Sequence, residues 1–321
     1  SILLRLSSLF LNISFSHPSF LLLHPFIFFY SRMATAVEWI FATFYAGGIL
    51  LFLQYFIPFV IRVFGRRTQN ETVKLFEKKW KRDTVYLYQM PGTTTMPSVS
   101  PFCIKVEAFL RLHKINYERR YFIVGRGLNG KLPFIEFNGE HIADSQIILR
   151  RLGFHFKLNE YSNEIDSNFG HAITCMADQH TYNLFLHYKV THNQSNLFKG
   201  MMGGIVPDIL IDITTPIIAP IVSAMMHRRL HDAVGRFSDE EYRELTRKDL
   251  TTYQNILADK KFLFGDKVTT ADCSVFGHLA AALYLDQHCH PVYLLKSHQF
   301  VPLRQYVERV RDTLFGGKFA M

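Results

Sequence analysis

The chain has 321 residues, 48% hydrophobic and 15% aromatic, a composition that excludes an intrinsically disordered protein. Its formal net charge is +9, but most of the basic excess precedes residue 83, so the remainder is nearly neutral and does not indicate a nucleic-acid-binding domain. Four widely spaced cysteines exclude a disulfide framework and predict a domain in a reducing compartment.

Residues 1–32 contain no methionine and repeat Phe, Leu, Ser and His up to Met33. A second membrane or signal segment is one interpretation of this composition. However, the apolar run is interrupted by His17-Pro18 and His24-Pro25, which suits neither a signal peptide nor a spanning helix. We therefore expect a non-native or disordered extension, with translation starting at Met33.

The next segment, residues 33–64, holds an uncharged apolar stretch from Trp39 to Ile61. A helix needs roughly 20 apolar residues to cross a bilayer, and a buried core helix is seldom apolar on all faces for so long. We predict one transmembrane helix here. Basic residues follow it while Glu38 precedes it, so the positive-inside rule places the soluble domain in the cytosol.

Residues 65–83 form a basic juxtamembrane segment that includes "KLFEKKWKR". One interpretation is contact with anionic headgroups, with Trp80 at the interface. The other is a solvated helix, and the sequence leaves both open.

Residues 84–153 alternate between strand and helix patterns. Pro101 fits the first turn of a helix whose core positions are Cys103, Val106 and Leu110. The hairpin signal Asn138-Gly139 joins two short strands. The predicted elements are strands at Val85–Gln89, Tyr117–Phe122, Phe134–Phe137 and His141–Ala143, with helices over Pro101–Leu112 and Ser145–Leu152.

Residues 154–321 show only helical periodicity, which predicts an all-helical lobe. The stretch Met201–Met226 is apolar enough to suggest a second span. Its aspartates and its prolines favour broken packing helices or an interfacial hairpin instead. Thr269-Thr270-Ala271-Asp272 predicts a capping box at the start of a late helix.

Together, the "SPFC" helix start, "GKLPFIEFNGEHIADS" and the late "GDKVTTAD" resemble the glutathione S-transferase architecture over roughly residues 83–321. The implied fold class is an α/β thioredoxin-like N-terminal lobe plus an all-α C-terminal lobe, here preceded by one transmembrane helix. More narrowly, Ser100-Pro101-Phe102-Cys103 and the brief link to Lys131–Ile135 resemble the metaxin and failed-axon-connections branch. The N-terminal anchor is similar to that of the nematode cadmium-responsive proteins of this branch.

The resemblance implies a glutathione site. Pro133 matches the cis proline whose neighbours, here including Leu132, hold the cysteinyl part of glutathione. Asp144-Ser145 match the acidic-serine pair that binds the γ-glutamyl end, where a helix N-terminus offers free N–H groups. The same two residues could equally be a helix cap without a ligand.

The resemblance also assigns roles to Ser100 and Cys103. Ser100 matches the transferase serine, or the first cysteine of a redox C-x-x-C motif, so dithiol chemistry within this motif is excluded. Cys103 matches the inward second cysteine, and we interpret it as packing rather than as a nucleophile. Ser100 is therefore the catalytic candidate, through stabilisation of a glutathione thiolate.

Two observations limit this interpretation. The link "IVGRGLNGKL" before Pro133 is too short for the helix that transferases place there, so part of the usual site is missing. The cluster His288-Cys289-His290 lacks a second set of ligands at metal-site spacing, so we predict no metal.

We therefore predict a membrane-anchored glutathione S-transferase-like protein, in stress or cadmium detoxification by family resemblance. The alternative is a non-catalytic, metaxin-like, membrane-tethered protein-interaction module. The expected partners are the membrane, glutathione, and a protein partner or a second copy, with no nucleic acid. The resemblance implies the lysosomal membrane, with the mitochondrial outer membrane as the alternative.

Overall fold

The computed structural model describes residues 74–121, 131–192, 208–284 and 288–319, with isolated positions at 38–40, 43, 47, 54, 194–195 and 199. The expected extension over 1–32 and nearly all of the predicted anchor over 33–64 lie outside these residues, as does the short link over 122–130. Within the described ranges, no helix is both long enough and apolar enough to cross a membrane.

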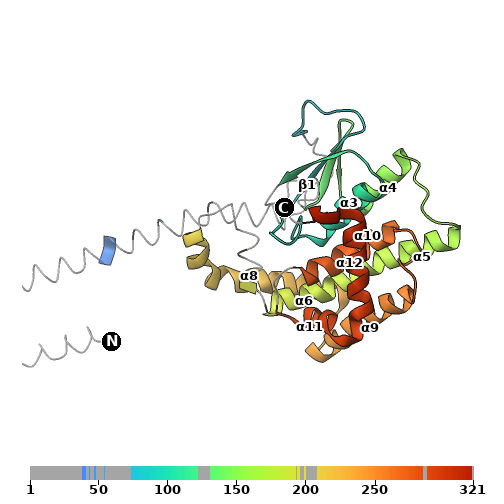
Figure 1. Cartoon of the computed structure of the whole chain (residues 1–321). Coiled ribbons are helices and arrows are strands. Elements are labelled where there is room, and N and C mark those ends of the chain that lie inside the picture. The colour runs from blue at the N-terminus through green and yellow to red at the C-terminus, as the bar shows by residue number, and fades with distance from the viewer. Residues whose placement is uncertain are drawn as a thin grey trace, which may run out of the picture. The chain divides into compact units, whose positions relative to one another are not determined.

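The first lobe is a four-stranded mixed sheet with two helices (Figure 1). The strand order is β2-β1-β3-β4, in which β1 pairs parallel with β2 and antiparallel with β3, and β3 pairs antiparallel with β4. Every residue of β1 is buried, because both faces of the sheet are covered there: Val85 and Leu87 belong to the main core, and Tyr86 and Tyr88 pack with Phe134 in a second cluster. The elements are β1 (Val85–Gln89), α3 (Pro101–Leu112), β2 (Tyr117–Tyr121), β3 (Phe134–Phe137), β4 (Glu140–Ala143) and α4 (Ser145–His155).

Local sequence signals account for these elements. Pro101 begins α3, where its missing N–H removes no helical hydrogen bond. Asn138 and Gly139 both adopt positive φ, 49° and 82°, as a two-residue hairpin turn requires. Helix α4 extends beyond the predicted Leu152 to His155, and the N–H of Phe156 closes its last turn on the Leu152 carbonyl.

The segment at 74–83 corrects one of the sequence interpretations, because it is not a solvated helix. Its Phe76 ring packs 5.6 Å from Tyr88 and 6.0 Å from Phe134. The buried Glu136 carboxylate in β3 accepts the backbone N–H groups of Phe76 and Glu77 at 2.7 and 2.8 Å, and the Tyr88 hydroxyl at 2.9 Å. The segment is therefore held against the sheet by one buried carboxylate.

The second lobe is helical in the ranges that the structure describes, as predicted. Its α5, η2 and α6 are consecutive, and η2 is a π-helix, a geometry often found at functional sites. The elements are α5 (Glu164–Cys175), η2 (Met176–Thr181), α6 (Tyr182–His192), α8 (Asp208–Val234), α9 (Asp239–Leu257), α10 (Thr270–Leu283), α11 (His290–Lys296), η3 (His298–Phe300), α12 (Val301–Phe315) and η4 (Gly316–Lys318).

Helix α8 differs from the expectation of broken helices, because it continues through Pro216 and Pro220. It packs against α6, and the Ser223 hydroxyl of α8 donates to the Val190 carbonyl of α6. The predicted packing role is therefore confirmed, whereas the predicted interruption at the prolines is wrong. Tertiary packing against α6 can outweigh the lost helical hydrogen bonds.

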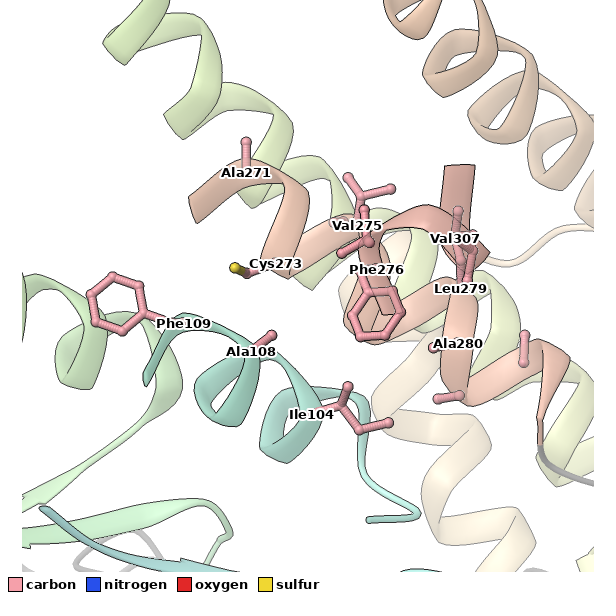
Figure 2. Packing of buried hydrophobic residues seen from close by; sticks show 14 of the residues in the cluster. Ile104, Ala108, Phe109, Ala271, Cys273, Val275, Phe276, Leu279, Ala280 and Val307 are labelled. Atoms are coloured by element: carbon pink, nitrogen blue, oxygen red, sulfur yellow. The ribbon is translucent and has the colours of Figure 1, made fainter. Parts of the chain in front are cut away.

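The two lobes meet where α3 crosses α10, and this contact forms a large part of the core (Figure 2). Ile104, Ala108 and Phe109 of α3 lie beside Cys273 and Phe276 of α10. Gly277 permits the close approach, because a Cβ added there would lie 2.6 Å from the Pro101 carbonyl oxygen.

The predicted capping box begins α10 as expected. The Asp272 carboxylate accepts the Thr269 N–H and the Thr269 hydroxyl, each at 2.8 Å. It also accepts the Tyr306 hydroxyl at 2.9 Å, so the cap ties α10 to α12.

Candidate functional site

The predicted ligand residues gather at one edge of the sheet. In β3, Phe134 pairs with Ala143 of β4 and with Tyr88 of β1, and β3 runs antiparallel to both strands. The residue before Phe134 and the residues after Ala143 and Tyr88 therefore reach the same edge of the sheet; they are Pro133, Asp144 and Gln89. The Leu132–Pro133 bond is cis, as the resemblance implied. Beyond Gln89, the chain leads through a loop to the start of α3, which brings the predicted pieces of the site to one region.

Ser100 is the N-cap residue of α3 and is only 8% exposed. Its side chain makes no capping hydrogen bond to the helix. The Ser100 and Ser98 hydroxyls and the Met90 backbone lie close enough to the Cys103 thiol to act toward a lower pKa of that thiol. Burial outweighs their effect and raises the pKa of the Cys103 thiol, so Cys103 occupies an uncharged packing position in the core.

Asp144 and Ser145 open α4. Asp144 has a φ of 79°, and its carboxylate accepts the N–H of Gln146 at 2.9 Å and of Ile147 at 3.4 Å. Its side chain therefore caps the helix, which is one of the two roles that the sequence left open for Asp144. Ser145 is 6% exposed, so the residue expected to meet a ligand is largely covered.

A buried ionic cluster lies next to these residues and was not predicted. The Asp178 carboxylate of η2 contacts Lys105 Nζ at 2.5 Å, His278 Nε2 at 3.0 Å and Gln146 Nε2 at 3.1 Å. Lys105, Asp178 and His278 are at most 3% exposed. The cluster thus joins α3 and α4 of the first lobe to η2 and α10 of the second.

The cluster holds one ion pair and a histidine whose charge is disfavoured. Burial alone would raise the pKa of Asp178, but hydrogen bonding to His278 and the charge of Lys105 outweigh it and lower the pKa to about 2. For His278, burial dominates and lowers the pKa despite the bond to Asp178. Asp178 therefore stays ionised and compensates the buried Lys105 ammonium.

Sequence periodicity could not reveal this cluster. Lys105 lies in an amphipathic helix pattern, where a lysine normally indicates a solvated face. Its partner Asp178 is 73 residues away, and His278 is a further 100 residues along the chain. The three side chains come together only when the two lobes are packed against each other.

Aromatic side chains flank the cluster near the start of α3. The Phe102 ring lies 4.7 Å from Tyr182 of α6 and 5.1 Å from His278, in both cases between ring centroids. Phe102 and Tyr182 are partly exposed. Together they offer an apolar wall next to Ser100.

Two hollows on the described surface lie elsewhere. One, of about 640 Å³, lies between the loop at Thr94 and the end of α12. The other, of about 260 Å³, is lined in part by His288, Cys289 and His290. Cys289 is the N-cap residue of α11, and the described ranges contain no group of three or more side chains able to hold a metal ion.

The order of strands and helices, the cis proline before β3 and the following helical lobe define the glutathione S-transferase fold. Two family models agree with this architecture. The glutathione S-transferase N-terminal domain matches residues 101–196, and the glutathione S-transferase C-terminal domain matches residues 246–310. The chain belongs to the glutathione S-transferase-like superfamily, in the metaxin and failed-axon-connections branch.

The chain is also similar to individual proteins. The Failed axon connections protein of Drosophila melanogaster is 30% identical over 253 residues, covering 74% of this chain and 59% of that protein. This chain thus spans less than two thirds of that relative's length. Glutathione transferase GSTFuA2 from Phanerochaete chrysosporium is 14% identical, with a TM-score of 0.49 over 72% of this chain and 98% of its own. Beta-etherase LigF from Sphingobium sp. strain SYK-6 is 15% identical, with a TM-score of 0.47 over 71% and 94%.

Proposed function

We propose that this chain is a membrane-anchored glutathione S-transferase-like protein that binds glutathione at the edge of its sheet. The observation that supports it is that cis Pro133 and the N-terminus of α4 lie opposite each other at that edge, from which the loop after β1 leads to the N-terminus of α3. The cluster around Asp178 adds support, because it fastens the first turn of α4 to α3 through Gln146 and Lys105.

In this proposal the main chain around Leu132 and Pro133 holds the cysteinyl part of glutathione. The first turn of α4, at Asp144 and Ser145, receives the γ-glutamyl carboxylate. The Ser100 hydroxyl donates a hydrogen bond to the glutathione thiolate, which lowers the pKa of that thiol. The thiolate then attacks an electrophile, forming a carbon–sulfur bond as the leaving group departs.

The test uses the full chain in detergent, with glutathione binding followed by calorimetric titration and conjugation by the loss of a reactive electrophile. We expect Ser100→Ala to lower turnover about 10- to 100-fold, the effect of one hydrogen bond to a charged group. Ser98→Ala is the matched control, because Ser98 also lies near the Cys103 thiol but is not assigned a role at glutathione. Equal turnover in Ser100→Ala and wild type would overturn the catalytic role of Ser100.

A second candidate is a non-catalytic, metaxin-like interaction module. It is favoured by the burial of Ser100 and by the hydrogen bond that the Asp144 carboxylate accepts from its own helix. It predicts no calorimetric signal at millimolar glutathione from a folded sample, together with a stoichiometric protein partner retained by residues 74–321. Saturable glutathione binding that weakens in Asp144→Ala would argue against it.

The anchor over residues 33–64 and the cytosolic orientation extend the proposal, and their support is the apolar stretch followed by basic residues. We expect the full chain to stay in the membrane fraction after alkaline extraction. Protease added to intact organelles should remove the soluble domain. Release by alkali would contradict the anchor.

The cellular setting is proposed from the family resemblance. We expect the protein in the lysosomal membrane, with the mitochondrial outer membrane as the alternative. We also expect it to act in stress or in cadmium detoxification. Fractionation of the two organelles distinguishes the membranes. Loss of the protein should raise cadmium sensitivity, and unchanged sensitivity would remove this part of the proposal.

A further inference from the structure

Helix α8 carries an apolar row on its exposed side. Ile209 and Ile213 are 69% and 64% exposed, and Pro216, Pro220 and Ala224 are also exposed. These five positions follow the spacing i, i+4, i+7, i+11 and i+15, so they lie along one line of the helix. Arg228, also exposed, stands at the next helical turn of the same line.

The opposite side of α8 is already occupied. Ile211, Ile218 and Val222 are at most 4% exposed, and the helix packs there against α6. The exposed row is therefore separate from the side that packs on α6. It is a second, largely apolar side, broken near its start by the exposed Asp212, whose carboxylate pairs with Lys199 at 2.7 Å. An ordinary surface helix of a soluble domain does not need such an apolar row.

The prolines determine how deeply this side could enter a membrane. Because Pro216 and Pro220 have no N–H, the carbonyl oxygens of Asp212 and Pro216 lose their helical donors. Such carbonyls are costly in hydrocarbon but can bond to water or headgroups at the interface. The row therefore suits a helix lying in the membrane surface and not crossing it, and Arg228 at its end suits an anionic headgroup.

We propose that the row Ile209, Ile213, Pro216, Pro220 and Ala224 docks on the surface of an anionic lipid membrane. The proposal rests on the membrane attachment proposed above. If residues 39–61 span a bilayer, the chain from residue 61 to Lys74 can reach at most about 45 Å, so the domain must stay near that membrane. Docking through α8 would then give the tethered domain a fixed orientation, with little additional entropy lost.

The test uses the full chain in lipid nanodiscs that contain phosphatidylserine and a lipid with a nitroxide high on its acyl chain. An environment-sensitive dye is attached at Ala224→Cys, in a Cys175→Ser background because the other three native cysteines are buried. A dye at Ile165→Cys, an exposed position on α5, is the control. A third dye, at Gly47→Cys, reports whether the predicted anchor is inserted.

We expect the nitroxide to quench the Ala224 dye about twofold or more, and the Ile165 dye much less. Adding Ile213→Glu should abolish the quenching at Ala224, whereas Ile165→Glu should leave it unchanged. Absence of quenching at Ala224 would overturn the docking proposal. This holds also where the dye reports an apolar environment without quenching, because a second copy or another protein then covers the row in place of lipid. Absence of quenching at Gly47 would instead count against the anchor, because Gly47 lies in the predicted span. The Gly47 and Ala224 dyes are measured separately, so failure of the anchor and failure of the docking can be distinguished.

Discussion

At the scale of single residues, His278 should make stability depend on pH. Burial lowers its pKa, and an unfolded histidine titrates near about 6.5. Between that value and its lower folded pKa, the unfolded chain binds more protons than the folded one. The free energy of unfolding should therefore fall as the pH falls below about 6.5, by at most about 1.4 kcal/mol per pH unit from this group.

Urea unfolding of the full chain at several pH values between about 5 and 7 measures this dependence. His278→Gln should reduce the slope, while His298→Gln, an exposed position on η3, should keep it. A smaller slope remains because burial also lowers the pKa of His187 and His290. An identical slope in His278→Gln and wild type would contradict the assignment.

At the scale of elements, the crossing of α3 and α10 depends on Gly277. A methyl group there would meet the Pro101 carbonyl oxygen at 2.6 Å and the Lys105 nitrogen at 3.1 Å, both backbone atoms that cannot rotate away. We expect Gly277→Ala to lower the free energy of unfolding by about 1–3 kcal/mol, through overpacking.

Gly153 in α4 is the matched control, because an added Cβ meets nothing within 4 Å. Gly153→Ala should raise the free energy of unfolding by about 0.5–1 kcal/mol, since alanine is the better helix former. Urea unfolding of both variants checks the pair. If Gly277→Ala were as stable as Gly153→Ala, the close approach of the two helices would be wrong.

The contact between segment 74–83 and the sheet depends on Glu136. Glu136→Ala leaves two backbone N–H groups and the Tyr88 hydroxyl without this acceptor, so we expect a loss of about 2–4 kcal/mol. Trypsin should also cut faster at the lysines between residues 74 and 82. Glu140→Ala, which removes an exposed pair with Arg151, should change stability by about 0.5 kcal/mol or less. Unchanged cleavage in Glu136→Ala would contradict the contact.

At the scale of the whole molecule, the Lys105–Asp178 pair should make the two lobes unfold together. Asp178→Leu leaves the Lys105 ammonium buried without its carboxylate, so we expect a loss of about 3–5 kcal/mol. Adding Lys105→Met removes the uncompensated charge and should restore part of that loss. Urea unfolding of the single and double variants gives the coupling energy. Strictly additive losses would show that the pair does not connect the lobes.

Much of the architecture could be predicted because its signals are local. Short runs of apolar and aromatic residues located β1 and β3, Asn138-Gly139 located the hairpin, and Thr269 with Asp272 located the start of α10. The position of cis Pro133 followed from the family resemblance and was confirmed. Helix α8 was the main error, because its two prolines locally indicate a break that packing against α6 overrides.

Chain-local chemistry was sufficient to identify the strands and the helix caps, because those signals lie within a few neighbouring positions, whereas the residues of the candidate site followed from the family resemblance. The surroundings of the side chains depended on tertiary packing. Ser100 is largely buried near Cys103, Asp144 caps its own helix, and Glu136 holds a segment about 60 residues before it in the chain. Lys105 is buried rather than solvated because α10 and η2, distant in sequence, cover it and supply its counter-charge. Burial and charge compensation are properties of neighbours in space, so no sequence window contains them.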